Sequence, residues 1–80
     1  MRVDKFLKVS RIIKRRTIAK EACDGGRVDI SGRVAKAGSE VSVGDIVTVH
    51  FGNSDLSVRV LDLKESTRKE DAENMYETIV

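Results

Sequence analysis

The sequence has few of the residues that build redox and zinc sites, since cysteine and histidine occur once each in 80 residues. Proline and tryptophan are absent. The single cysteine, Cys23, excludes an internal disulfide, and Cys23 with His50 cannot supply the four ligands of the usual zinc site. Cys23 is better interpreted as a small apolar residue on a helix. We therefore expect no metal and no other cofactor.

Long apolar runs are also missing. No uncharged apolar run approaches the ~20 residues that a membrane span needs, and the first residues, Met1 to Lys5, do not contain the apolar core of a secretory signal. We therefore expect no membrane partner and a cytoplasmic location.

Sequence signals for catalysis are scarce. His50 stands alone inside a predicted strand, no Ser or Cys nucleophile has a histidine partner nearby in sequence, and no phosphate-binding GxxxxGK(S/T) pattern occurs. The chain length predicts one small domain, in which a catalytic pocket with its supporting residues is hard to fit. We expect a binding module, not an enzyme.

Charge is divided unevenly along the chain. Residues 1–20 hold eight basic residues against Asp4 alone, a net charge of +7, whereas residues 21–80 hold seven basic and twelve acidic residues, a net charge of −5. A basic N-terminal segment on an otherwise acidic protein is typical of a polyanion-binding surface, and the alternative is a solvated helix face. The candidate RNA-binding residues are Arg2, Lys5, Lys8, Arg11, Lys14, Arg15, Arg16 and Lys20.

The few aromatic residues narrow the type of polyanion. Two of the three, Phe6 and Phe51, are expected in the core, which disfavours single-strand binding by base stacking and favours recognition of a folded RNA by shape and backbone. A DNA-binding regulator is an alternative, because two helices are predicted in succession. The second of them offers Thr17, Lys20 and Glu21, with no Asn or Gln to read adenine.

The pattern of apolar residues changes along the chain from helical spacing to alternation. It predicts helices over 3–9 and 16–24, the second with Ile18, Ala19 and Ala22 as its apolar stripe and Gly25-Gly26 at its end. Strands are predicted over 28–30, 33–36, 46–51 and 56–63. The fold class is α+β, with two N-terminal helices packed on a small antiparallel sheet of three to five strands.

The C-terminal residues 64–80 form an acidic tail that we expect to be helical or frayed. Ser66 or Thr67 is a candidate cap for a last helix, whose apolar side would consist of Ala72, Met75, Tyr76 and Ile79. The acidic excess makes this tail a poor nucleic-acid surface.

Several short motifs resemble the RNA-binding domain named after small-subunit ribosomal protein S4. They are, in order, Arg2–Leu7, Arg15–Ala19, Gly26–Val28, Ser31-Gly32 and Gly44-Asp45. The resemblance implies an αL-type fold whose helical face binds structured RNA, with a core motif over residues 1–50 within a domain of residues 1–63. Ser31 stands where that family has asparagine. Gly32 keeps the backbone freedom that the turn needs, whereas any contact that the asparagine side chain makes in the family is not expected here.

Within that family, the segments Lys8–Lys20 and Asn74–Tyr76 resemble short free-standing members that act in bacterial ribosome-associated quality control. This resemblance implies a monomer that binds obstructed large ribosomal subunits and contacts ribosomal RNA and peptidyl-tRNA. It also implies support for the alanine tailing of stalled nascent chains by a partner protein, RqcH. The family motif assigns contacts first to Arg2, Arg11, Arg15 and Arg16, with the lysines in support.

Two further alternatives follow from the same family. One is a heat-shock-type factor that recycles large subunits carrying nascent chains, although the relative of that type has a longer, basic C-terminal extension. The other is an RNA-modifying enzyme, because this domain is often fused to pseudouridine synthases. The chain of 80 residues has no room for that catalytic domain.

Overall fold

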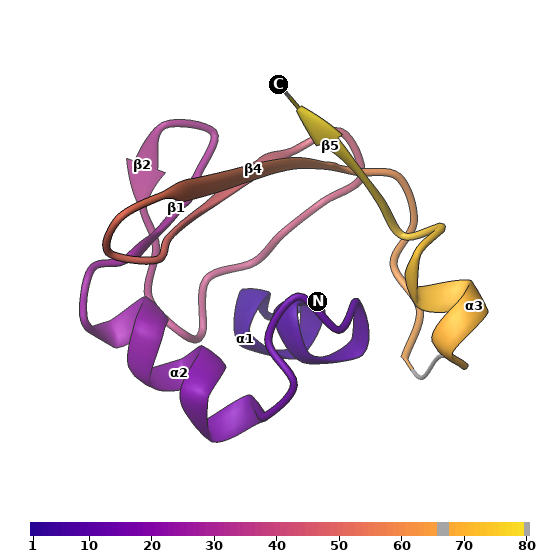
Figure 1. Ribbon diagram of the computed structural model, residues 1–80, viewed down its shortest axis with the longest axis horizontal. Coiled ribbons are helices and arrows are strands. Elements are labelled where there is room, and N and C mark those ends of the chain that lie inside the picture. Colours follow the sequence, from indigo (N-terminus) through magenta and orange to yellow (C-terminus); the bar gives the residue numbers. More distant parts are fainter. Residues whose placement is uncertain (66–67, 80) are drawn as a thin grey trace.

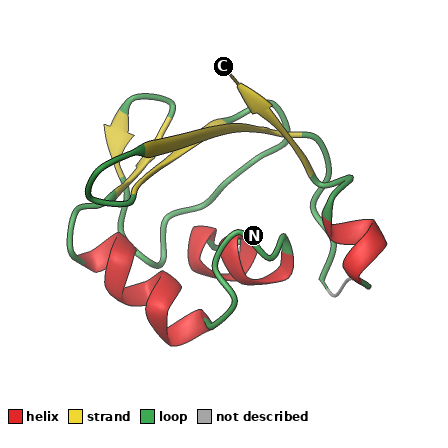
Figure 2. Cartoon of the chain, in the orientation of Figure 1, coloured by secondary structure: helices red, strands yellow, loops and turns green. Residues whose placement is uncertain are grey.

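Two helices lie against one face of a curved, five-stranded antiparallel sheet (Figure 1, Figure 2). The computed structural model describes residues 1–65 and 68–79. The helices are α1 (Val3–Val9), α2 (Arg16–Asp24) and a short α3 (Lys69–Ala72), and the strands are β1 (Val28–Ile30), β2 (Arg33–Val34), β3 (Ile46–His50), β4 (Asp55–Val60) and β5 (Tyr76–Ile79). The predicted α+β fold is confirmed. None of the helices in the described ranges is long and apolar enough to cross a membrane.

The sheet has the strand order β2-β1-β3-β4-β5, with β3 at its centre. Its longest ladder joins β3 and β4, from Ile46 opposite Arg59 to His50 opposite Asp55. Because side chains alternate between the two faces of a strand, Val47 and Val49 point to the same side of the sheet. Both are buried under the helices, as the alternating pattern predicts.

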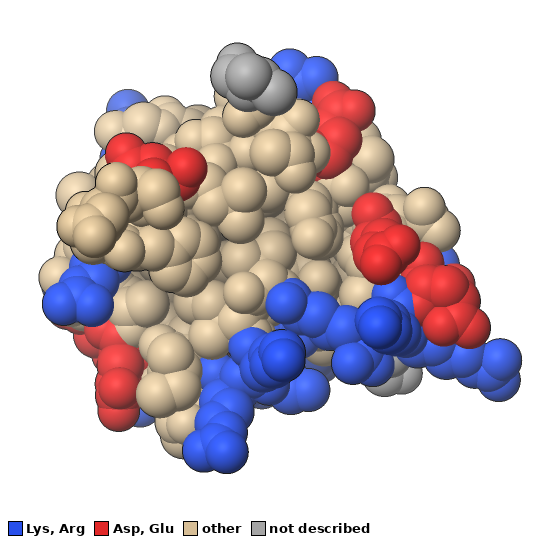
Figure 3. All heavy atoms as spheres, viewed as in Figure 1, with Lys and Arg blue, Asp and Glu red and all other residues tan. Residues whose placement is uncertain are grey.

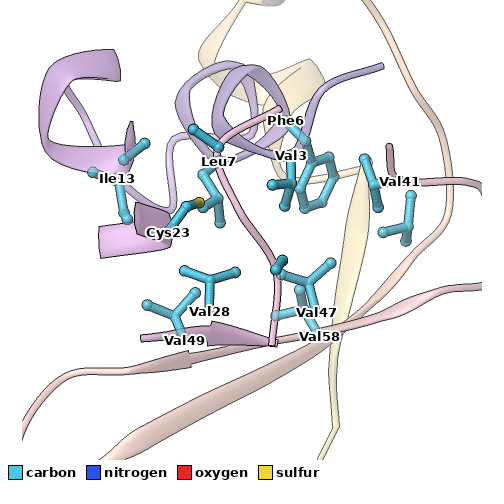
Figure 4. Close-up of a cluster of buried hydrophobic side chains, with 14 of the residues drawn as sticks. Val3, Phe6, Leu7, Ile13, Cys23, Val28, Val41, Val47, Val49 and Val58 are labelled. Carbon is cyan, nitrogen blue, oxygen red and sulfur yellow. The ribbon is translucent and has the colours of Figure 1, made fainter. Parts of the chain in front are cut away.

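The core lies between the sheet and the two N-terminal helices (Figure 4). Helix α1 contributes Val3, Phe6 and Leu7, which follow the i, i+3, i+4 spacing of one helix face and are fully buried. Helix α2 contributes only Ala19 and Cys23. Because this apolar side of α1 faces the sheet, Lys8 on the other side of the helix is exposed to solvent.

Two apolar residues that the sequence placed inside are half exposed. Ile18 is 48% exposed and Phe51 is 49% exposed. Neighbouring helix positions differ by about 100° around the axis, so Ile18 points away from the core when Ala19 points into it. Phe51 follows the end of β3, where the sheet no longer holds it under the helices. Of the two phenylalanines, only Phe6 is in the core.

Glycine and serine turns fix the ends of the elements. Gly26 has a φ of 77°, and the N–H groups of Gly26 and Arg27 donate to the carbonyls of Cys23 and Ala22, which is the hydrogen-bond pattern of a Schellman cap. Ser31 and Gly32 both have positive φ, 50° and 84°, as the hairpin turn between β1 and β2 requires. Ser31 therefore adopts the left-handed conformation that asparagine tolerates better than serine.

The tail differs from the prediction of a helical or frayed segment. Among the described residues of the tail, only Lys69–Ala72 is helical; the chain then forms β5, which pairs with β4 from Tyr76 opposite Val60 to Ile79 opposite Ser57. Without β5, the N–H and C=O groups along that edge of β4 would lack a partner strand. Met75, fully buried, fills the core just before β5. The proposed caps Ser66 and Thr67 lie outside the described residues.

Candidate RNA-binding surface

The basic residues of positions 1–20 lie together on the helical side of the molecule. We call this the basic surface; it comprises Arg2, Lys5, Lys8, Arg11, Lys14, Arg15, Arg16 and Lys20, all exposed except Lys5, which is intermediate. Figure 3 shows lysine and arginine side chains as a band along the lower side of the molecule, where Figure 1 places α1 and α2. The fold thus gathers the eight predicted residues on two helices and their linker.

A buried carboxylate holds two of the arginines. Asp4, in the first turn of α1, is 2% exposed, and its two oxygens lie 3.2 Å from Arg2 Nη2 and 3.5 Å from Arg16 Nη2. The backbone N–H of Lys5 also donates to Asp4, at 2.8 Å. Arg2 precedes α1 and Arg16 begins α2, so one side chain fixes the guanidinium groups of both helix starts. Asp4 is thus the ion-pair partner of both arginines.

The linker between α1 and α2 turns its charged side chains outward while Ile13 points inward. Ile13 is 8% exposed, its N–H donates to the carbonyl of Leu7 at 3.0 Å, and Ser10 is buried beside it. Arg11 and Lys14 are exposed, and Arg11 has a φ of 62°, a left-handed conformation that is costly for an arginine. The backbone here is held so that successive cations face solvent.

The start of α2 adds a partial positive charge to these cations. Arg15 is its N-cap residue and makes no side-chain cap hydrogen bond, and the first turn of α2 carries no acidic residue. The N–H groups of a helix start attract phosphate, as does the helix dipole. Arg15 and Arg16 add guanidinium groups, which bind phosphate oxygens in a planar fork. The arrangement can bind phosphate groups without any further ligand.

One member of the basic surface is paired with the tail. Lys5 contacts the carboxylate of Glu65, and this interaction lowers the pKa of Glu65 from its ordinary value. Glu65 is 80% exposed, so this ion pair is open to competition from a phosphate.

The structure gives no support to the residues considered for catalysis. Burial raises the pKa of the Cys23 thiol to about 11, so the thiolate needed for nucleophilic attack is scarce at neutral pH. His50 lies 3.0 Å from Asp29 and 2.8 Å from Asp55, one carboxylate on each ring nitrogen. Both carboxylates raise the pKa of His50, and each ring nitrogen is already occupied by one of them. Within the described ranges, no cluster of three or more His, Cys, Asp or Glu could hold a metal.

The sequence did not predict that the tail lies beside the basic surface. A groove lies between the α1–α2 linker and the C-terminal segment, and Lys8, Arg11 and Lys14 line one side of it while Lys69 and Tyr76 line the other. The net acidic composition of the tail gave no indication of this arrangement, because the groove depends on where Lys69 and Tyr76 lie and not on the total charge of the tail. A signal was available in Asn74–Tyr76, which resembled the family without an assigned role.

This fold, with its basic helical side, defines an RNA-binding domain of the S4 class. The S4 domain matches residues 1–47, more than half of the chain. Among solved structures, Heat Shock Protein 15 of Vibrio cholerae superposes with a TM-score of 0.90 at 26% identity, covering 99% of this chain and 81% of that one. The solution structure of the hypothetical protein HP1423 gives a TM-score of 0.86 at 29% identity over 100% and 98% of the two chains.

Closer relatives narrow the class. The RQC P-site tRNA stabilizing factor of Streptococcus pneumoniae is 57% identical over 99% of this chain and 90% of its own length. The protein of the same name from Bacillus subtilis is 59% identical over 95% and 88%. A Heat shock protein 15 homolog of Aeromonas salmonicida is 34% identical over 85% of this chain but only 52% of its own length. The chain belongs to the family of RQC P-site tRNA stabilizing factors, which confirms the resemblance to short S4-type proteins.

Proposed function

We propose that this protein is a non-catalytic RNA-binding factor of bacterial ribosome-associated quality control. It binds obstructed large ribosomal subunits that retain peptidyl-tRNA and holds the tRNA in the P site against ribosomal RNA. The observation that carries the proposal is the basic surface, fixed by buried Asp4, on a chain 57% identical to a P-site tRNA stabilizing factor. The binding unit is residues 1–63, with its core motif in residues 1–50, and the tail of residues 64–80 contributes the edge strand β5 (Tyr76–Ile79).

The residues of the basic surface divide by role. Arg2 and Arg16 are held by Asp4 and present fixed guanidinium groups, while Arg11 and Arg15 are exposed beside them and reach further phosphates. The lysines at 5, 8, 14 and 20 add charge along the same side. Contacts of this kind give affinity and orientation, and they carry no sequence information. The factor therefore acts by steadying the tRNA, and no bond is made or broken by the protein.

Steadying the tRNA supports the addition of a C-terminal alanine tail by RqcH. This partner acts on the nascent chain attached to the tRNA, so it benefits from a tRNA that stays in place, whether or not it touches this protein. We propose a monomer that is cytoplasmic and ribosome-associated. Because the Vibrio cholerae Heat Shock Protein 15 structure is described as trimeric, the mass of this protein in solution is a direct test of the monomer.

A heat-shock-type factor that recycles large subunits carrying nascent chains is the second candidate. The TM-score of 0.90 with Heat Shock Protein 15 favours it. Against it, this chain spans only 52% of the length of the Aeromonas salmonicida homolog and is 34% identical to it. Both candidates would bind RNA through the helical side. The binding surface therefore does not distinguish them, whereas the state of the ribosomal subunit that each prefers does.

Co-sedimentation with purified large ribosomal subunits, with and without peptidyl-tRNA, tests the proposal. We expect binding that favours the tRNA-bearing subunit and that is lost or strongly reduced by Arg16→Ala. Arg33→Ala is the matched control, since it removes an exposed arginine from β2, outside the basic surface. Equal binding to empty subunits would instead indicate a general ribosome factor, and no binding would contradict the proposal.

A further inference from the structure

The groove between the α1–α2 linker and the tail has a composition that suits RNA. Its volume is about 490 Å³, within the range of about 300–1,000 Å³ in which proteins hold small ligands. Four cations line it against one carboxylate, Glu73; they are Lys8, Arg11, Lys14 and Lys69. The electrostatic character of the groove is therefore positive, although the tail as a whole is acidic.

The groove is continuous with the basic surface. Lys8, Arg11 and Lys14 belong to both, and the band of lysine and arginine side chains in Figure 3 extends to the right-hand side of the molecule, where Figure 1 places α3. Lys69 lines the same groove as Arg11, so the tail extends the basic surface by one cation. The tail adds a wall to the surface at this end.

Tyr76 gives the groove an aromatic side. It begins β5, is partly buried against the core, and lines the groove next to Ala72. A ring fixed in this way loses little entropy when a nucleobase or ribose packs on it, and stacking on aromatic rings does not depend on base identity. The groove thus combines cations, which suit the phosphate of a nucleotide, with an aromatic ring, which suits its base or ribose.

We propose that this groove binds a nucleotide segment of the RNA partner, with Lys69 contacting phosphate and Tyr76 contacting the base or sugar. The inference rests on the proposed function. It extends the RNA-binding site of the protein from the basic surface of residues 1–20 to the tail. It also gives β5 a second role, since pairing with β4 places Tyr76 opposite Val60 and at the groove.

Lys69→Gln tests the phosphate contact. The probe is the purified large ribosomal subunit with peptidyl-tRNA, and the dissociation constant is measured by co-sedimentation over a series of KCl concentrations. We expect the slope of log affinity against log salt to become shallower by roughly one. Lys64→Gln is the control, because Lys64 is an exposed tail lysine that pairs with Asp62 and does not line the groove. Its slope should equal that of the wild type.

Arg15→Gln separates failure of this inference from failure of the proposed function. Arg15 is on the basic surface and does not line the groove. If Arg15→Gln makes the slope shallower while Lys69→Gln leaves it at the wild-type value, the groove is wrong and the proposed function stands. If neither variant changes the slope, the proposed function itself is contradicted. Thermal unfolding of each variant shows that the fold is retained.

The contact of Tyr76 has its own readout. The chain has one tyrosine, so protein made with 3-fluorotyrosine gives a single fluorine resonance. The labelled protein is titrated with free tRNA, which is smaller than the tRNA-bearing subunit. We expect the resonance to shift on addition of tRNA, and to shift less in the Lys69→Gln variant. A resonance that stays unchanged at saturation with both tRNA and the large subunit would overturn the role of Tyr76.

Discussion

At the scale of single residues, Asp4 holds the guanidinium groups of Arg2 and Arg16 in place on the basic surface. Asp4→Asn removes the negative charge between Arg2 and Arg16 while keeping the size of the side chain. Hydrogen bonds to charged groups contribute about 1.5–3 kcal/mol each, less where the partners are half exposed, so we expect a loss of about 1–2 kcal/mol in the free energy of unfolding. Urea denaturation measures this loss.

The same variant separates positioning from bulk charge. Asp4→Asn makes the protein one unit more positive, so a purely electrostatic surface would bind RNA more tightly. If the arginines must be held in place, binding to large subunits weakens instead. Glu21→Gln is the control, because it removes an exposed carboxylate from α2 with the same change in net charge. Weaker binding by both variants would contradict the assigned role of Asp4.

His50 gives the fold a pH dependence. Asp29 and Asp55 raise its pKa in the folded protein above the ordinary value of 6.5. The folded state therefore binds this proton more tightly than the unfolded chain does, and the stabilisation is complete below about pH 6.5. It is lost as the pH rises through the higher pKa of the folded state.

We expect the melting temperature of the wild type to exceed that of His50→Gln at pH 6 and the difference to shrink by pH 8. Gln keeps a hydrogen-bond donor and removes the titration, so other titrating groups cancel in the comparison. Melting curves of both proteins across this range measure the effect. A difference that is constant with pH, or that grows toward alkaline pH, would contradict it.

At the scale of elements, β5 makes the tail part of the folded domain. Met75, just before β5, is fully buried, and truncation of a buried methionine costs about 2–5 kcal/mol. We expect Met75→Ala to lower the free energy of unfolding by an amount in this range. Urea denaturation of the full chain measures it.

Thr78→Ala is the matched control within β5. Thr78 is exposed, and substitutions at such positions change stability by about 0.5 kcal/mol or less. If Met75→Ala were as mild as Thr78→Ala, the tail would be frayed in solution, as the sequence first indicated.

Elements with strong local patterns were predictable and those set by tertiary contacts were not. The bounds of α1 and α2 follow from apolar spacing and from Gly25-Gly26, and the structure has the same bounds. The tail was misread because Ala72, Met75, Tyr76 and Ile79 fit helical spacing equally well. The segment forms a strand because it pairs with the open edge of β4. A pattern within the tail alone cannot show that this edge is available.

The candidate site shows the same division between local and tertiary information. Charge count alone selected the eight residues of the basic surface, because a run of cations needs no fold to be visible. The fold was needed to show that Asp4 holds both Arg2 and Arg16, and that Lys69 joins the cations of the linker across a groove.

At the scale of the whole molecule, charge is distributed unevenly. Residues 1–20, with a net charge of +7, form α1 and the first part of α2, while residues 21–80, with a net charge of −5, supply the end of α2 and, in the described part of the chain, all five strands and α3. Such a protein approaches a polyanion with its helical side first. Orientation is thus set by electrostatics before any close contact forms.

The most direct test of this account is the salt dependence of binding to large ribosomal subunits that carry peptidyl-tRNA. If the basic surface neutralises about five phosphates, log affinity plotted against log salt concentration has a slope on the order of −4. The account predicts a slope of this size, made shallower by roughly one when Arg15 is replaced by Gln. A slope near zero in the wild type would contradict it, because binding would then not depend on the cations of the helical side.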